Sequence, residues 1–194
     1  GHEGGVSALA FTPDGGTLIS ASYADQTIRT WDPAAGGETS SVRTARRVRS
    51  IALSADRDKL LAADARGAVA SYAFEGGTIG AVVATLENAG DSIALSPDSR
   101  FLAVTAFRKP VDVWQIDSGS ILRTLAAPFD VRLLVFDPTG KRLAGAGDGN
   151  AVAVWDVGRW KPRIAPVARA AAESSAAALD FSPDGRFLAA GFSD

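Results

Sequence analysis

Apolar and β-branched residues occur along the chain in short blocks that polar turn residues separate. In residues 1–44 the blocks are VSALAF (6–11), TLISAS (17–22), TIRTW (27–31) and ETSSVRT (38–44). Asp, Pro and Gly gather between them, and these residues tolerate or preset the dihedral angles of tight turns. No block has the length and the 3.6-residue period of a helix. The pattern therefore predicts an all-β chain of short strands joined by tight turns.

The four-block pattern recurs along the chain. One set of markers is the turns TPDG, SPDS, DPTG and SPDG, which contain Pro13, Pro97, Pro138 and Pro183. The first two prolines are 84 residues apart, which is two periods of about 42 residues, and Ala55 holds the position between them. The later intervals are 41 and 45 residues.

Aromatic residues give the same period independently. They are spaced 41, 42 and 41 residues apart, at Trp31, Tyr72, Trp114 and Trp155. Two sets of markers in phase predict tandem repeats within one domain that covers residues 1–194. The approximate repeat boundaries are 1–44, 45–86, 87–127, 128–172 and 173–194, and the last repeat is truncated.

The first block of each repeat is apolar at nearly every position, as in VRSIALS and VRLLVFD. A strand that is apolar on both faces should be covered on both faces. Strands near the axis of radially packed sheets meet this condition. Four strands in each repeat of about 42 residues are typical of the antiparallel blade of a β-propeller.

The chain resembles the WD-repeat family, in a divergent and bacterial form. The first repeat carries Gly1–His2, the turn residue Asp25 and Trp31–Asp32, in the family's order, and the fourth carries Trp155–Asp156. The other repeats depart from the pattern, because Gln115 follows Trp114 and Ala73 follows Tyr72. The resemblance implies a propeller of four complete blades and the first half of a fifth. It also implies a seven-bladed parent, of which this chain is an excerpt.

His2 is the single histidine, and a lone histidine could be a general base or a metal ligand. The family resemblance implies instead a structural hydrogen-bonded tetrad of His2, Asp25, Trp31 and either Ser20 or Ser22. The other repeats lack the full set, with Arg66, Arg108 and Gly149 at the position of Asp25. We expect apolar packing around Tyr72, Trp114 and Trp155 to hold those blades together, and Asp194 to be the tetrad aspartate of the fifth repeat.

Composition narrows the functional classes. The 46% of hydrophobic residues suffices for a core, and 20 Lys and Arg nearly balance 22 Asp and Glu. The net charge of −2 argues against a general nucleic-acid binder. The absence of cysteine excludes disulfides and thiolate metal sites from the chain. It fits the cytoplasm, which we expect, and also a bacterial periplasm. No apolar run reaches the roughly 18 residues of a membrane span.

Three other motifs favour structural interpretations. GAGDGN (145–150) resembles a phosphate-binding loop, but the strand-like AVAVW follows it where such a loop should open a helix. The turn acids Asp14, Asp98, Asp137 and Asp184 recur once per repeat, so they cannot gather around one calcium ion. ARAAAESSAAA (168–178) is expected to be a linker. We therefore expect no cofactor and no metal.

The densest charge run is RTARRVR (43–49). In a propeller its loop and the loops between second and third strands open on one disc face. Five basic residues would meet there: Arg46, Arg47, Arg66, Arg108 and Lys109. They could form a docking site for an acidic or phosphorylated segment of a protein partner. The alternative is an ordinary solvated surface, with the acids Asp64, Glu87 and Asp91 diluting the charge.

These patterns favour a non-catalytic protein–protein interaction scaffold, since every candidate site has a structural interpretation. Two alternatives stay open. The chain could be a regulatory or sensor module of a larger bacterial signalling enzyme, such as a kinase or an NTPase. It could also be a periplasmic propeller of the translocation type, which shares the SPDG turn at Ser182–Gly185.

Overall fold

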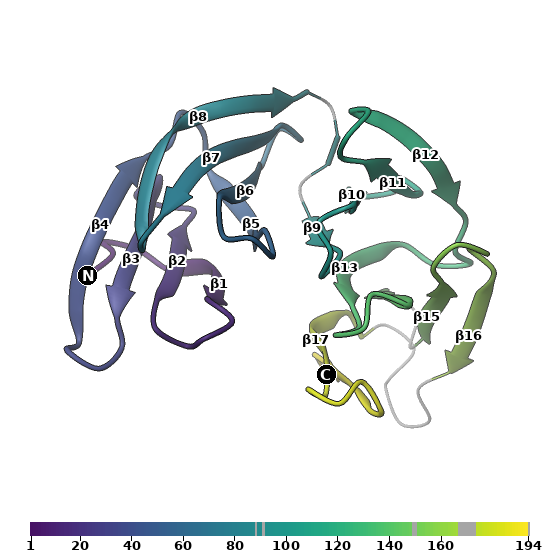
Figure 1. The fold of residues 1–194 in the computed structure, drawn as a ribbon. Helices are drawn as coiled ribbons and strands as arrows, with labels where there is room; N and C mark the ends of the chain where they lie inside the picture. The colour runs from purple at the N-terminus through teal and green to yellow at the C-terminus, as the bar shows by residue number, and fades with distance from the viewer. Residues whose placement is uncertain (88, 91, 149–150, 167–173, 194) are drawn as a thin grey trace. The chain divides into compact units, whose positions relative to one another are not determined.

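The computed structural model describes all residues of the chain except 88, 91, 149–150, 167–173 and 194. The described residues contain 18 β-strands and no helix. The strands form four four-stranded antiparallel sheets and one two-stranded sheet (Figure 1). The prediction of an all-β fold built from four-stranded propeller blades, with half of a fifth, is confirmed. We call the sheets blades one to five in chain order.

The chain divides into two compact units, Gly1–Asp91 and Ser92–Asp194, which are described separately. The first unit holds two blades, and in each of them the strands are paired in chain order. Blade one consists of β1 (Val6–Phe11), β2 (Leu18–Ser22), β3 (Thr27–Asp32) and β4 (Gly37–Arg43). Blade two consists of β5 (Val48–Leu53), β6 (Lys59–Asp64), β7 (Val69–Glu75) and β8 (Thr78–Leu86).

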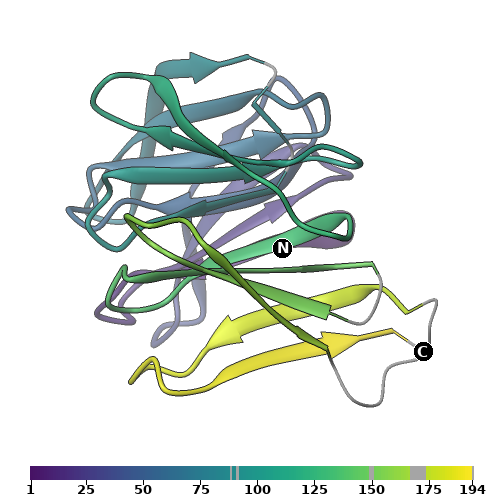
Figure 2. The ribbon, with the colours of Figure 1, turned by 90° about the vertical axis from the view of Figure 1, so that its right-hand side faces the viewer.

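The second unit holds two complete blades and the two-stranded sheet (Figure 2). Blade three consists of β9 (Ser92–Leu95), β10 (Phe101–Thr105), β11 (Val111–Gln115) and β12 (Ser120–Leu125). Blade four consists of β13 (Val131–Phe136), β14 (Arg142–Gly147), β15 (Ala151–Asp156) and β16 (Pro162–Pro166). Blade five consists of β17 (Ala176–Phe181) and β18 (Leu188–Phe192).

Neighbouring blades within a unit pack through their first strands. In the first unit β5 lies against β1 and β2, and in the second unit β13 lies between β9 and β17. The second strands of the four complete blades are the most buried, and they are rich in Ala, Ser and Gly. Small side chains suit a strand that has a sheet packed on both of its faces, because they let the backbones approach.

The first strands do not all meet the expectation of burial. Val48 and Ile51 of β5 are only 2% and 9% exposed. Val6 and Leu9, at the corresponding positions of β1, are 52% and 63% exposed. The difference arises because β5 packs against blade one, whereas these side chains of β1 point away from blade two. An apolar strand of this kind is buried only where another blade covers it.

Two irregularities recur with the repeat and support tandem copying of one module. The register of the first strand shifts after its first residue in blades one, two, four and five, between Val6/Ala8, Val48/Ser50, Val131/Leu133 and Ala176/Ala178. The turn after each first strand contains one residue with positive φ, at Gly15, Arg57, Ser99, Gly140 and Gly185. β-Bulges and left-handed turn residues are local features that a copied sequence reproduces.

Side chains of the turns also link consecutive blades. The guanidinium of Arg57 in blade two pairs with the carboxylate of Asp14 in blade one. In the second unit the guanidinium of Arg142 in blade four donates a hydrogen bond to the carbonyl oxygen of Gly185 in blade five. Each link joins positions 43 residues apart, so it connects one repeat to the next.

Candidate functional site

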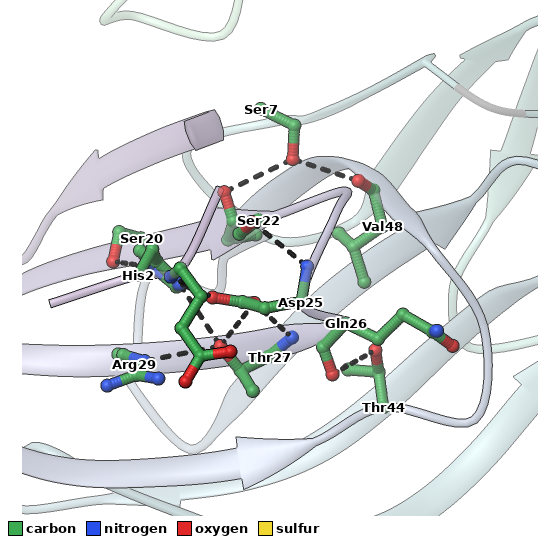
Figure 3. Close-up of polar contacts among 12 residues, drawn as sticks. His2, Ser7, Ser20, Ser22, Asp25, Gln26, Thr27, Arg29, Thr44 and Val48 are labelled. Atoms are coloured by element: carbon green, nitrogen blue, oxygen red, sulfur yellow. Dashed lines mark hydrogen bonds and ion pairs between the residues drawn. The ribbon is translucent and has the colours of Figure 1, made fainter. Parts of the chain in front are cut away.

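The single histidine lies in a chain of hydrogen bonds within blade one (Figure 3). Its Nδ1 is 2.9 Å from Oδ2 of Asp25, and its Nε2 is 2.7 Å from Oγ of Ser20. The indole N–H of Trp31 donates to the same Ser20 oxygen at 2.8 Å. One arrangement of protons satisfies every group: Trp31 donates to Ser20, Ser20 donates to Nε2 of His2, and Nδ1–H of His2 donates to Asp25.

Asp25 is the terminus of this chain and accepts further hydrogen bonds. The hydroxyl and the amide of Thr27 donate to Oδ1 at 2.7 and 3.0 Å, and the amide of Glu3 donates to Oδ2 at 3.0 Å. Burial by itself would raise the pKa of Asp25. The hydrogen bonds from Thr27, Glu3 and His2 outweigh it and hold that pKa well below its usual range. Asp25 is thus an ionised acceptor whose lone pairs are already engaged.

The structure distinguishes the two serines that the sequence left open. Ser20 takes part in the chain of hydrogen bonds that includes His2. Oγ of Ser22 instead accepts a long hydrogen bond from the amide of Asp25 at 3.4 Å. The sequence reasoning did not single out Thr27 and Ser7. The Oγ of Ser7 lies 3.1 Å from the carbonyl oxygen of Ala21 and 2.9 Å from that of Val48, so it bridges blades one and two. The Asp-x-Thr spacing of Asp25 and Thr27 is a signal that could have identified Thr27.

The other complete blades carry an aromatic residue at the position of Trp31 but lack the serine to which Trp31 donates. Trp31 stands opposite Leu18 in the neighbouring strand, and Tyr72, Trp114 and Trp155 stand opposite leucines in the same way. Two residues after the leucine, where blade one has Ser20, the other blades have Ala62, Val104 and Gly145. None of these side chains can accept a hydrogen bond. The indole nitrogen of Trp114 is buried and has no partner among the described residues.

Trp155 shows how a blade manages without the serine. It is fully buried, and a Cβ atom added at Gly145 would lie 2.9 Å from its ring. The indole therefore packs directly on the backbone of the neighbouring strand. Gly145 belongs to β14, which runs to Gly147, and β15 begins at Ala151. The rest of the Gly-rich motif, residues 149–150, lies outside the described residues, and so does Asp194.

The basic residues of the first unit surround a hollow of about 480 Å³. Its lining comes from three loops and consists of Tyr23, Gln26, Ala45, Arg46, Arg47, Ala65 and Arg66. Arg46 is engaged, since its Nη1 lies 3.3 Å from Oδ2 of Asp64 and 3.4 Å from Oε2 of Glu87. The guanidinium of Arg47 lies over the ring of Tyr23, 5.1 Å from the centroid.

Neighbouring arginines affect the ionisation of the Tyr23 hydroxyl. Hydrogen bonding to Arg47, and then to Arg49, lowers the pKa of its hydroxyl despite the opposing effect of burial. The buried carboxylate of Asp64 organises the opposite wall. Its Oδ1 accepts hydrogen bonds from the amides of Arg66 at 2.7 Å and Ala68 at 3.1 Å, while Oδ2 holds Arg46. Asp64 therefore holds both the backbone of the loop after β6 and the side chain of Arg46.

Arg108 and Lys109 belong to the second unit and line another hollow, of about 420 Å³. Its walls are mostly apolar and include Pro110, Pro128 and Phe129. The amide of Arg108 donates to Oδ1 of Asp130 at 2.8 Å. Arg46, Arg47 and Arg66 thus form one basic group and Arg108 with Lys109 another, each described within its own unit.

The turn acids have local partners. Asp14, Asp98 and Asp184 each accept a 2.6 Å hydrogen bond from the hydroxyl two residues earlier. Blade four exchanges the two residue types: Asp137 takes the hydroxyl position, and Thr139 donates to it at 2.9 Å. The hydrogen bond from Thr12, followed by those from the Gly16 amide and Arg57, lowers the pKa of Asp14 to about 2. Within the described part of the chain, no cluster of acids and histidine has the composition of a metal site.

Comparison with known proteins finds the WD-repeat pattern at both ends of the chain. The family model described as "WD domain, G-beta repeat" matches residues 1–32 and 171–194. An uncharacterized WD repeat-containing protein, sll1491, of Synechocystis sp. (strain ATCC 27184 / PCC 6803 / Kazusa) is 53% identical over 36 residues. The match covers 19% of this chain and 10% of that protein. In the described residues, no helix has the length and apolar character needed to cross a membrane.

Proposed function

We propose that this chain, which carries WD repeats, is a non-catalytic scaffold that binds a protein partner through loops at the ends of its blades. The observation that supports this function is a difference in exposure between two groups of polar side chains. The residues with catalytic potential are nearly buried and bonded to one another. The exposed cations line open hollows on the loops.

The hydrogen-bonded chain of blade one deserves comparison with a serine nucleophile. Ser20, His2 and Asp25 stand in the order of a Ser-His-Asp triad. However, Ser20 is only 2% exposed, and the side chains of His2 and Asp25 are 4% and 8% exposed. The Ser20 oxygen also accepts the indole N–H of Trp31. A nucleophile needs an approach for its substrate, so this arrangement supports a structural role.

The loops of the first unit support docking. Arg47 and Arg66 are exposed, and both line the same hollow. Arg108 and Lys109 offer a second basic group in the second unit. Exposed arginines beside an aromatic ring are common in protein interfaces, because the guanidinium can bind a carboxylate and stack on a ring at once. An acidic segment of a protein partner fits this chemistry.

Affinity capture with matched charge-reversal variants tests the proposal. The immobilised chain, the Arg47→Glu/Arg66→Glu double variant and an Arg123→Glu control are exposed to the same lysate. Arg123 is an exposed cation of β12 and lines neither hollow. We expect quantitative mass spectrometry to find a protein that wild type and control retain and that the double variant loses. The scaffold proposal is wrong for this surface if no captured protein distinguishes the variants.

A further inference from the structure

The hollow of the first unit combines loops from both blades of that unit. The loop after β2 supplies Tyr23 and Gln26, the loop after β4 supplies Arg47, and the loop after β6 supplies Arg66. Each loop is fixed. The carbonyl oxygen of Gln26 accepts the amide and the hydroxyl of Thr44 at 2.8 and 3.0 Å, which joins the first two loops. The amide of Ala65 also donates to the carbonyl oxygen of Arg47 at 2.9 Å, so backbone hydrogen bonds connect all three loops.

The three arginines of this hollow differ in whether a carboxylate pairs with them. Arg46 is paired with Asp64 and Glu87. In the described part of the chain, no carboxylate pairs with the guanidinium of Arg47 or of Arg66. Arg47 instead lies against Tyr23, and hydrogen bonding to Arg47 lowers the pKa of the Tyr23 hydroxyl. Among the described residues, the hollow thus presents two cations without a carboxylate partner, together with Tyr23 and Gln26.

We propose that this hollow binds the phosphoryl group of a phosphorylated segment of a protein partner, with Arg47 and Arg66 as the principal ligands. The inference rests on the proposed scaffold function and names the partner's chemistry. A phosphoryl group carries almost two negative charges near neutral pH and three terminal oxygens. It can therefore engage donors from several loops. A carboxylate has one charge and two oxygens, and one guanidinium in a bidentate pair satisfies it.

Peptide titration tests this inference directly. The probes are a pool of short fluorescent peptides with a fixed central phosphoserine, matched pools with serine or aspartate there, and inorganic phosphate. Equivalent phosphothreonine and phosphotyrosine pools show which phosphorylated residue the hollow prefers. The protein is the whole chain, and fluorescence anisotropy gives the dissociation constants.

We expect the phosphorylated pools to bind at least about tenfold more tightly than the aspartate and serine pools, because charge-assisted hydrogen bonds are the stronger ones. Arg47→Gln and Arg66→Gln should each weaken binding by about tenfold or more, which is the range of one hydrogen bond to a charged group. Arg123→Gln should leave the affinity unchanged. Circular dichroism of each variant verifies that it is folded.

The pH dependence distinguishes phosphate from carboxylate. The second pKa of a phosphate ester is about 6, so affinity for the phosphorylated pool should rise between about pH 5 and pH 7.5. Affinity for the aspartate pool should stay flat there, because that carboxylate is already ionised. Added salt should weaken phosphopeptide binding, since it screens charges in an open hollow.

Several outcomes would overturn the inference. Equal affinity for the aspartate and phosphoserine pools, or equal losses in Arg123→Gln and Arg47→Gln, would remove its basis. Inorganic phosphate that binds as tightly as the peptides would indicate a small-ion site instead. Phosphatase treatment of the lysate separates the two proposals. A partner that still needs Arg47 and Arg66 after dephosphorylation would leave the scaffold function standing and disprove the phosphoryl site.

Discussion

Blades one and three are built from the same strands and turns, yet they treat their central tryptophan differently. In blade one the N–H of Trp31 donates to Ser20, and the hydrogen-bonded chain continues through His2 to Asp25. In blade three the N–H of Trp114 is buried without a partner among the described residues, because Val104 replaces the serine. The blade fold therefore does not depend on the polar chain.

Apolar packing explains how blade three tolerates the loss. An unsatisfied buried donor costs about 1–3 kcal/mol. Leu102, Ala103 and Val104 of β10 and Val113 of β11 are all fully buried in the same blade. Each buried aliphatic side chain of valine or leucine size contributes about 1.5–3 kcal/mol. Burial on this scale offsets one orphaned indole. The comparison shows that the polar chain adds stability to a sheet that packing already forms.

The largest effect should come from Asp25→Ala in blade one. This change leaves the ring N–H of His2, the Thr27 hydroxyl and the Glu3 amide without their acceptor. We expect a loss of about 2–4 kcal/mol in the free energy of unfolding, measured by urea denaturation. Asp117→Ala, at an exposed turn in blade three, is the control and should change stability by less than about 0.5 kcal/mol. Similar losses in both variants would contradict the central position given to Asp25.

The same carboxylate should make stability depend on acid pH. The pKa of Asp25 is lowered in the folded state, so the unfolded chain takes up the proton first as the pH falls. The contribution of Asp25 is present above the unfolded pKa of about 3.9 and is lost as the pH falls below it. Between about pH 5 and pH 3, wild type should lose more stability than Asp25→Asn. Parallel pH profiles for the two proteins would contradict this origin of the pKa shift.

Exchanging the residue beside the tryptophan should make the hydrogen bonding of Trp31 and Trp114 more alike. Ser20→Val gives blade one the residue of blade three and orphans the Trp31 N–H, with an expected loss of about 1–3 kcal/mol. Val104→Thr offers Trp114 an acceptor and should raise stability by at most about 1 kcal/mol. The NMR chemical shift of each indole N–H reports hydrogen bonding directly. A Trp114 signal that Val104→Thr leaves unmoved would show that the two sites are not equivalent.

The smallest effect should come from the turns. Gly15 in blade one and Ser99 in blade three both have positive φ, at 69° and 57°. Serine tolerates this conformation less well than glycine, so Ser99→Gly should stabilise the chain by about 0.5–1 kcal/mol. The reverse change, Gly15→Ser, should destabilise it by a similar amount. Thermal unfolding measures both, and a destabilised Ser99→Gly variant would show that the serine side chain outweighs the backbone strain.

Much of blade one could be predicted from the sequence. The predicted strand 6–11 matches β1 (Val6–Phe11), and 27–31 lies within β3 (Thr27–Asp32). Periodic apolar blocks and turn residues act locally, so their spacing is readable along the chain. The register between strands is not readable in this way. Ser20 and Ser22 share one face of β2, and only the pairing of Leu18 with Trp31 shows which serine the indole reaches.

The basic hollow was only partly predictable. The run 43–49 pointed to Arg46 and Arg47, but the charge of Arg46 is engaged by Asp64 and Glu87, which are 18 and 41 residues away. Tyr23 lies more than twenty residues before Arg47, and nothing in the sequence pattern places its ring beneath that guanidinium. Contacts of this kind depend on how neighbouring blades stack, which side-chain chemistry alone does not determine.

The side-chain links between consecutive repeats have a consequence for how the protein unfolds. Asp14 forms an ion pair with Arg57, and Arg142 donates a hydrogen bond to the Gly185 carbonyl oxygen. Each of these interactions reaches only the adjacent repeat. Couplings limited to nearest neighbours let a disturbance spread stepwise from one module to the next. Amide hydrogen exchange in such a chain should therefore show graded protection that changes in whole modules, with the protection of β5 sensitive to the loss of β1.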